Sequence, residues 1–203
     1  MRKFLVLLCS CMIAQLVIAQ ILPDSEKDRK KKKIDKFFYA ILGIQSTGIN
    51  GDSESYNESL IGFHGGFGIR LAELNDNLGI RTELIYSMQG SKYEDTYVSG
   101  KVVLSYINLP FVIRAASKGG FYGEAGLQPG FLVSAKDKYN DQTNDYKDYI
   151  NGFDFGGLLG LGYQKNRISV GLRIAQGITN INKDEDEYKD RNFVASLRTT
   201  FAF

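Results

Sequence analysis

Apolar and polar positions alternate with a period of two from residue 37 to the end of the chain. In residues 60–71 one phase reads Ile61, Phe63, Gly65, Phe67, Ile69 and Leu71. The other phase carries glycines together with His64 and Arg70, and residues 78–89 repeat the scheme. Strand side chains point alternately to opposite faces, whereas a helix repeats every 3.6 residues. The pattern therefore predicts β-strands.

Eight segments of roughly 11–14 residues carry this alternation. They span residues 37–49, 59–71, 78–90, 101–115, 121–134, 152–163, 168–180 and 192–203. Ordinary strands average about 5–6 residues, and a tilted membrane-crossing strand needs about 9–11. The connections alternate between long and short, beginning with the long 50–58 and the short 72–77. This organisation predicts an all-β fold, an eight-stranded antiparallel up-and-down barrel with both termini on the short-turn side.

Alternation suits a soluble lipocalin-like barrel as well as a membrane barrel, and three features favour the membrane. The polar phase is mostly Gly, Ser and isolated charges rather than the mixture of a solvated face. The basic residues in the middle of the predicted strands are all arginines. The planar guanidinium group of arginine is suited to pairing with enclosed carboxylates. The last strand closes on Phe201 and Phe203, an ending that resembles the C-terminal signal read by the outer-membrane assembly machinery. We predict a transmembrane barrel whose apolar phase faces lipid.

Ionisable residues of the polar phase predict one charge cluster inside this barrel. Eight strands leave an interior just wide enough for side chains, and a buried charge needs a partner. We expect Arg–carboxylate pairs that fill the lumen and fix its shape. A gated solute path through the same residues is the alternative. The expected members are His64, Arg70, Arg81, Glu83, Arg114, Glu124, Asp154, Arg173 and Arg198.

Composition argues against most other site chemistry. One histidine and two cysteines cannot supply the four N/S ligands of a structural zinc. His64 falls mid-strand on the inward phase, where a hydrogen bond to Glu or Tyr is expected. A lipid-modifying outer-membrane enzyme using His64 is a remote alternative. The glycine runs at 65–68 and 156–162 open no helix after a strand, so they predict no nucleotide site. We predict no enzyme and no cofactor.

Residues 1–19 have the layout of a cleaved signal peptide. Two basic residues precede an apolar run that ends at Ala19, with about 16 apolar residues, short for a membrane-spanning helix. Cys9 and Cys11 both lie in this leader, so the mature chain is expected to contain no disulfide. Lipidation of Cys11 is the alternative.

Charge is unevenly distributed along the mature chain. The whole chain carries +2, and removing the two bases of the leader leaves zero. Residues 20–36 form a basic polar linker, which we place in the periplasm, and the barrel of residues 37–203 is net negative. No basic surface suited to nucleic acid is expected. An acidic run is predicted to be a solvated loop, with a calcium site as the alternative. It comprises Asp184, Glu185, Asp186, Glu187 and Asp190.

Three short motifs resemble a known family, in register and in the same order. Residues 83–90 read ELIYSMQG, residues 106–110 read YINLP, and residues 126–136 read GLQPGFLVSAK. They are similar to the motifs of PorT-like outer-membrane β-barrel proteins of Bacteroidetes. The resemblance runs from about Phe37 to Phe203 and implies an outer-membrane barrel, with Pro110 at a bulge or lapse in strand pairing. Family members are often labelled porin-like, and one branch takes part in protein secretion; the family has no catalytic residues.

These observations predict a small outer-membrane protein with a filled lumen and a structural or interaction role. The alternatives are an accessory role in protein secretion and narrow porin-like passage of a solute. The expected partners are outer-membrane lipid and the outer-membrane assembly machinery, with other envelope or secretion proteins as alternatives. No nucleic acid partner is expected. The expected location is the bacterial outer membrane, with both termini periplasmic.

Overall fold

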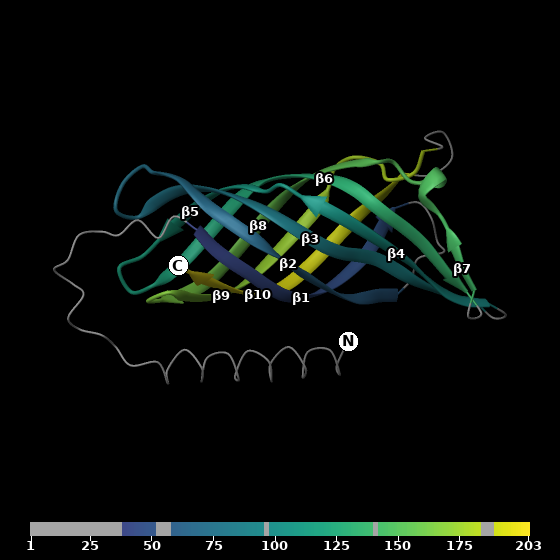
Figure 1. Ribbon diagram of the computed structural model, residues 1–203, viewed down its shortest axis with the longest axis horizontal. Helices are drawn as coiled ribbons and strands as arrows, with labels where there is room; N and C mark the ends of the chain where they lie inside the picture. The colour runs from purple at the N-terminus through teal and green to yellow at the C-terminus, as the bar shows by residue number, and fades with distance from the viewer. Residues whose placement is uncertain (1–37, 52–57, 96–97, 140–141, 184–188) are drawn as a thin grey trace.

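The alternating segments pair into a closed antiparallel sheet (Figure 1). The computed structural model describes residues 38–51, 58–95, 98–139, 142–183 and 189–203. The predicted leader of residues 1–19, the linker 20–36 and the acidic residues 184–187 lie outside these ranges. Asp190 lies inside them and is buried, accepting a hydrogen bond of 2.9 Å from Asn182 Nδ2.

Ten strand segments and one short helix make up the described chain. The strands are β1 (Phe38–Gly51), β2 (Glu58–Glu73), β3 (Leu78–Asp95), β4 (Val98–Asn108), β5 (Phe111–Ala116), β6 (Phe121–Tyr139), β7 (Gln142–Asp145), β8 (Phe153–Lys165), β9 (Ile168–Gly177) and β10 (Asp190–Ala202). The helix η2 is a single 3-10 turn at Lys147–Tyr149. In the described part of the chain, no helix has the length and apolar character needed to cross a membrane.

Closure of the ring confirms the predicted fold. β1 pairs with both β2 and β10, and the pairings continue in antiparallel fashion through β9, β8, β6, β4 and β3 back to β2. β4 and β5 both pair with β3 and β6, so together they occupy the place of one strand in the wall. β7 pairs only with β6. With β4 and β5 counted as one strand and β7 outside the ring, the segments form an eight-stranded up-and-down barrel.

Pro110 interrupts the strand that the sequence predicts over 101–115. Asn108 pairs with Ile85 and Phe111 with Thr82, so the register on β3 is unchanged across the break. Because proline has no N–H to donate, the hydrogen-bond ladder is interrupted at Pro110, and no β-bulge is formed. The Pro110 carbonyl still accepts from the Glu83 N–H at 3.0 Å, which keeps β4 and β5 in line.

Two connections predicted as long loops are largely strand, so that part of the prediction is wrong. β3 runs to Asp95 and β4 begins at Val98, where a loop was expected over 91–100. β6 runs to Tyr139 and pairs with β7, where a loop was expected over 135–151. The polar composition of these segments predicts loops, but a strand that leaves the membrane keeps its hydrogen-bond ladder with polar side chains. The result is a sheet that projects beyond the barrel, which we call the distal extension.

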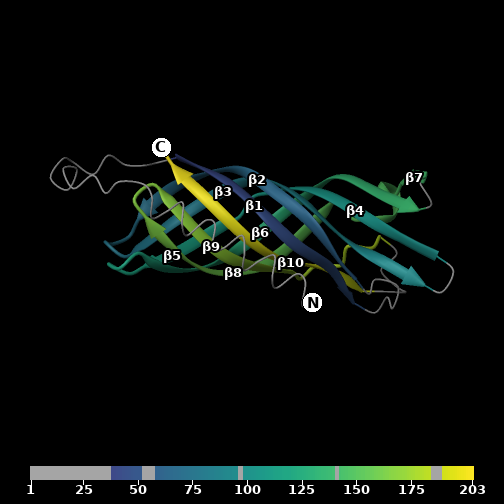
Figure 2. The same cartoon turned by 90° about the horizontal axis from the view of Figure 1, so that it is seen from below.

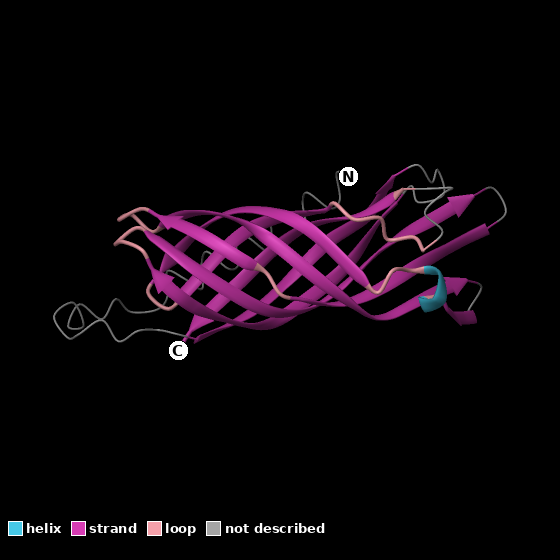
Figure 3. Ribbon diagram, turned by 90° about the horizontal axis from the view of Figure 1, so that it is seen from above, coloured by secondary structure: helices cyan, strands magenta, loops and turns pink. Residues whose placement is uncertain are grey.

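The two ends of the barrel differ in construction. The terminal end carries Phe38 and Ala202 and the tight connections 74–77, 117–120 and 166–167. The distal end carries the longer strands β3, β4 and β6, with β7 and η2 beyond the wall (Figures 2 and 3). Within the extension, the Tyr93 hydroxyl donates to Asp137 Oδ1 at 2.8 Å. Burial and this hydrogen bond raise the pKa of Tyr93 to about 12.

Apolar side chains cover the outer face of the barrel. Leu42, Phe67 and Leu161 each expose more than 60% of their surface. Aromatic pairs lie near both ends of the wall: Phe121 with Tyr163 at the terminal end, and Phe131 with Phe153 toward the distal end. From Phe121 to Phe131 along a strand tilted by about 40°, the rise is about 25 Å, the height of a lipid-facing band.

Inward-facing tyrosines cover glycines on the adjacent strand. Tyr39 pairs with Gly68, and Tyr122 pairs with Gly162. A Cβ at Gly68 would collide with the Tyr39 ring, and one at Gly162 with the Tyr122 hydroxyl. Glycine is required at these positions because the ring lies directly on the neighbouring backbone.

We expect Gly68→Ala to lower the free energy of unfolding by about 1–3 kcal/mol, the usual cost of overpacking. The added methyl displaces Tyr39 and with it the hydrogen bond from Tyr39 to Glu83. Gly157→Ala is the matched control, because nothing lies within 4 Å of a Cβ there. Urea unfolding of both variants in detergent micelles checks the prediction, and equal losses would contradict it.

Candidate functional site: the barrel interior

Glu83 on β3 is the centre of the interior charge cluster. Arg173 Nη1 on β9 lies 2.7 Å from Glu83 Oε2, and Arg198 Nη2 on β10 lies 2.7 Å from Oε1. The Tyr39 hydroxyl donates to Oε1 at 3.0 Å. These partners come from three other strands, so one carboxylate ties together much of the ring across the lumen.

Glu124 on β6 extends the cluster to the other side of the barrel. Arg173 Nη2 lies 2.6 Å from Glu124 Oε1, and Arg114 on β5 donates to Oε2 through Nε at 3.0 Å and Nη2 at 2.7 Å. The Arg114 guanidinium also lies over the Tyr122 ring, 3.9 Å from its centroid. All five charged side chains are buried. We call Glu83, Arg114, Glu124, Arg173 and Arg198 the charge plug.

The other predicted members lie outside the charge plug. Arg70 is at the terminal rim, 3.4 Å from Glu73. Asp154 lies toward the distal end and accepts from Asn192 Nδ2 and the Thr179 hydroxyl, both at 2.8 Å. Arg81 is buried on the terminal side of the charge plug. Its guanidinium carbon lies over the Tyr39 ring, 5.9 Å from the ring centroid.

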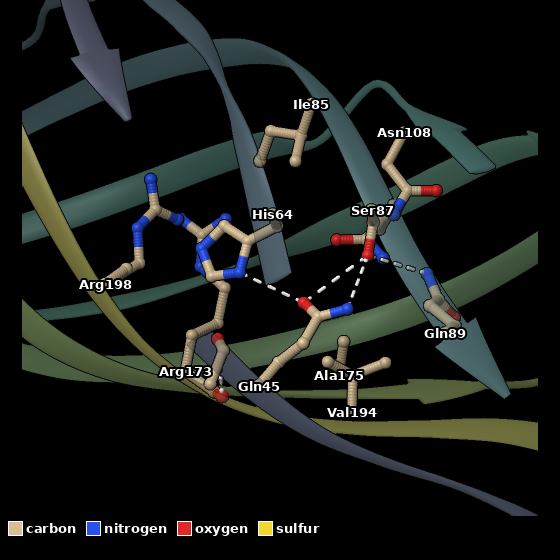
Figure 4. A pocket seen from close by; sticks show the side chains of 12 residues that line it. Gln45, His64, Ile85, Ser87, Gln89, Asn108, Arg173, Ala175, Val194 and Arg198 are labelled. Atoms are coloured by element: carbon tan, nitrogen blue, oxygen red, sulfur yellow. Dashed lines mark hydrogen bonds between the residues drawn. The ribbon is translucent and has the colours of Figure 1, made fainter. Parts of the chain in front are cut away.

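Among the described residues, His64 makes no hydrogen bond to Glu or Tyr, contrary to expectation. Its Nδ1 lies 3.0 Å from Gln45 Oε1, and the Gln45 amide donates to the Ser87 hydroxyl at 2.9 Å (Figure 4). The residue directly beside it on β1 is Gly43, where a Cβ would collide with the imidazole. His64 is therefore packed into a neutral hydrogen-bonded row on the distal side of the plug.

A cavity of about 30 Å³ lies between this row and the charge plug. His64, Gln89, Arg173 and Arg198 are among its lining residues (Figure 4). A single water needs about 10–15 Å³, so the cavity has room for about two. The space is too small for a hydrated solute.

A second, apolar plug closes the lumen toward the distal end. Ile49 on β1 packs into one cluster with residues of β4 and β6, which lie across the ring. The members are Ile49, Val102, Leu104, Tyr106, Leu132, Ala135, Ile150 and Ile181. An apolar constriction excludes ions by dewetting. The interior thus contains two barriers in series.

Sequence reasoning missed the apolar plug because it took the inward phase to be polar throughout. The sequence does contain an apolar inward phase on β4: Val102, Leu104 and Tyr106 occupy alternate positions and all three are buried. Ile150 and Ile181 reach the cluster from outside the wall strands, through a bridge between Ile150 and Asn182. That contact depends on three-dimensional proximity and has no local signal.

A closed wall with an apolar outer face and a filled polar and apolar interior defines a transmembrane β-barrel of the outer-membrane type. Residues 38–183 match the family described as outer membrane protein beta-barrel domain, and the chain belongs to that family. This membership implies the bacterial outer membrane as its location. No curated protein matches the chain.

Several solved outer-membrane proteins resemble this chain at low sequence identity, and the first of these shares its fold. The neisserial surface protein A (NspA) is 14% identical with a TM-score of 0.58, over 82% of this chain and 97% of that one. Ail, the attachment invasion locus protein of Yersinia pestis, is 13% identical with a TM-score of 0.48, over 82% and 99%. The outer membrane enzyme PagL is 13% identical with a TM-score of 0.47, over 79% and 99%.

Proposed function

We propose that this protein is a closed structural and interaction barrel of the outer membrane. The filled lumen carries the proposal: the charge plug and the apolar plug leave an interior cavity of only about 30 Å³ between them. A structural role needs a rigid wall, and ion pairs contributed by five strands supply that rigidity. The PorT-like motifs lie on β3, at the end of β4 and on β6, which supports assigning the chain to the PorT-like proteins.

The proposed orientation places both termini in the periplasm and the distal extension outside the cell. Short connections lie at the terminal end, as in outer-membrane barrels of known orientation. Phe201 and Phe203 face outward there, with ring centroids 5.6 Å apart, in a position accessible to the assembly machinery. Protease digestion of intact cells tests the orientation, with cleavage expected at the distal end of the barrel only.

The distal extension carries a surface suited to an anionic partner. Lys92 pairs with Lys101, and Lys101 pairs with Lys138, so three lysines lie side by side on adjacent strands. All three are exposed. Like charges directly opposite one another destabilise a sheet, so this lysine row costs stability in the isolated protein. An anionic surface laid against the row would offset that cost.

We expect Lys101→Gln to raise the free energy of unfolding of the isolated protein by about 0.2–1 kcal/mol, since it removes both like-charge neighbours. The same change should weaken retention on polyanionic supports such as heparin resin. Lys165→Gln, at the terminal end of β8, is the control and should change neither quantity. Loss of stability in Lys101→Gln would contradict the proposed role of the row.

Co-purification from native membranes tests the interaction role itself. The wild-type chain is expected to recover an envelope component that a Lys92→Gln, Lys101→Gln, Lys138→Gln variant does not. Folding of the variant is verified by the heat-dependent mobility shift of the barrel on a gel. Equal recovery by both chains would sink the proposal that the lysine row is the contact surface.

No catalytic role is proposed for His64. A nucleophile–base pair requires a hydroxyl activated by His, and His64 instead faces the amide oxygen of Gln45. We expect envelope lipid composition to be unchanged in a His64→Ala strain, measured by mass spectrometry of extracted lipid. An accumulated lipid species in that strain would identify a lipid-modifying enzyme instead.

A further inference from the structure

A cavity of about 380 Å³ opens at the terminal end of the barrel, on the other side of the charge plug from the small cavity. Four of its lining residues are basic: Arg70, Arg81, Arg114 and Lys118. Its two acids are Glu73 and Asp76. The wall also supplies neutral polar side chains from Asn75, Asn77, Ser117 and Gln164. Four basic side chains, two acidic ones and several neutral polar ones therefore surround an open space of molecular size.

Arg81 distinguishes this cavity from a simple solvent-filled entrance to the barrel. It is 9% exposed, and it makes no ion pair with any carboxylate in the described part of the chain. Its Nε is buried and donates no hydrogen bond. The Tyr39 ring at 5.9 Å offers only a weak attraction. A buried cation without an anionic partner is strongly penalised.

Arg114 adds a second unused donor on the same wall. Its Nε and Nη2 are used by Glu124, whereas its Nη1 is buried and has no partner. Arg114 is 2% exposed, so its position is fixed by the plug. Arg81 and Arg114, each with a buried N–H donor that lacks a hydrogen-bond partner, thus both line one polar cavity. Guanidinium forks match phosphate oxygens in geometry and charge.

We propose that the terminal cavity is a binding site for a phosphate group, held by Arg81 and by the free Nη1 of Arg114. Lys118, which is exposed at the rim, adds a point charge at the entrance. The group can belong to a free phosphate or to a lipid headgroup, since both present the same oxygens. This site is independent of the distal lysine row.

The test is a titration of the full refolded chain in zwitterionic detergent with sodium phosphate, against sodium chloride at equal ionic strength. Wild type should gain thermal stability with phosphate and not with chloride. Arg81→Gln should bind phosphate at least about tenfold more weakly, the loss expected for one charge-assisted hydrogen bond. Without phosphate, Arg81→Gln should be as stable as wild type or more so, because it removes an unpaired buried charge.

Arg191→Gln is the matched control, since Arg191 is an exposed arginine near the start of β10, at the distal end. It should keep the full response to phosphate. No gain in wild type, or an equal gain in Arg81→Gln, overturns the proposal. A loss of stability in Arg81→Gln without phosphate also overturns it, because Arg81 would then have a structural partner.

Bilayers distinguish the two sources of phosphate. The chain is reconstituted in phosphatidylcholine nanodiscs with and without phosphatidic acid, and free phosphate is added to each. A gain that disappears when phosphatidic acid is present assigns the lipid headgroup as occupant. A gain in both bilayers assigns free phosphate, and a gain in neither overturns the site.

Discussion

Glu83→Gln is expected to lower the free energy of unfolding by about 3–5 kcal/mol, the usual cost of breaking a buried ion pair by removing one partner. The substitution preserves shape and removes one negative charge. Arg173 and Arg198 donate to both oxygens of Glu83, with distances from 2.7 to 3.3 Å. Both arginines remain buried after the change: Arg173 keeps Glu124 as a charged acceptor at 2.6 Å, whereas Arg198 keeps only a long contact of 3.9 Å to Glu124.

Urea unfolding in detergent micelles, followed by circular dichroism, measures this loss. Glu73→Gln is the matched control because Glu73 pairs with Arg70 at the rim, where its side chain is 40% exposed. Exposed pairs contribute about 0–1 kcal/mol, so the control should change little. Similar losses in the two variants would show that the charge plug does not hold the ring together.

A second substitution separates charge balance from lost hydrogen bonds. In the charge plug three arginines face two glutamates, so Glu83→Gln increases an existing excess of positive charge. Adding Arg198→Gln removes the cation whose short ion-pair contacts are all to Glu83. The double variant should therefore recover part of the loss, and a double variant less stable than Glu83→Gln would contradict charge imbalance as the cause.

The wall of the barrel was predictable because each strand repeats one simple rule. Alternation assigns Arg81, Glu83 and Ser87 to one face of β3, and all three are buried in the structure. Strand length and turn length then fix the number of strands and their closure. These properties are local, so they can be read from neighbouring positions.

The partners inside the barrel were less predictable than the wall. Glu83 and Arg198 are 115 positions apart in sequence, and only the register of the closed ring brings them to the same height. Arg70 shares the phase of His64, yet it lies at the rim because it stands near the end of β2, which stops at Glu73. Phase determines the face of a residue, whereas height along the barrel depends on accumulated register.

The wild-type barrel is expected to give no open-channel steps in planar bilayers, because two barriers lie in series along its lumen. The charge plug blocks the terminal half with paired side chains, and the apolar plug blocks the distal half by excluding water. Opening one barrier leaves the other closed. Neither Glu83→Ser with Arg198→Ser nor Leu104→Ser with Tyr106→Ser should therefore conduct on its own.

The four substitutions combined should produce discrete conductance steps that are absent from the wild type and from both double variants. The Glu83 and Arg198 pair is removed together so that the net charge of the lumen is kept, and Leu104 and Tyr106 are the fully buried members of the apolar plug on β4. A heat-dependent mobility shift verifies folding of each variant before reconstitution. Steps in the wild type would identify a porin-like path, and steps in one double variant would show that the lumen has a single barrier.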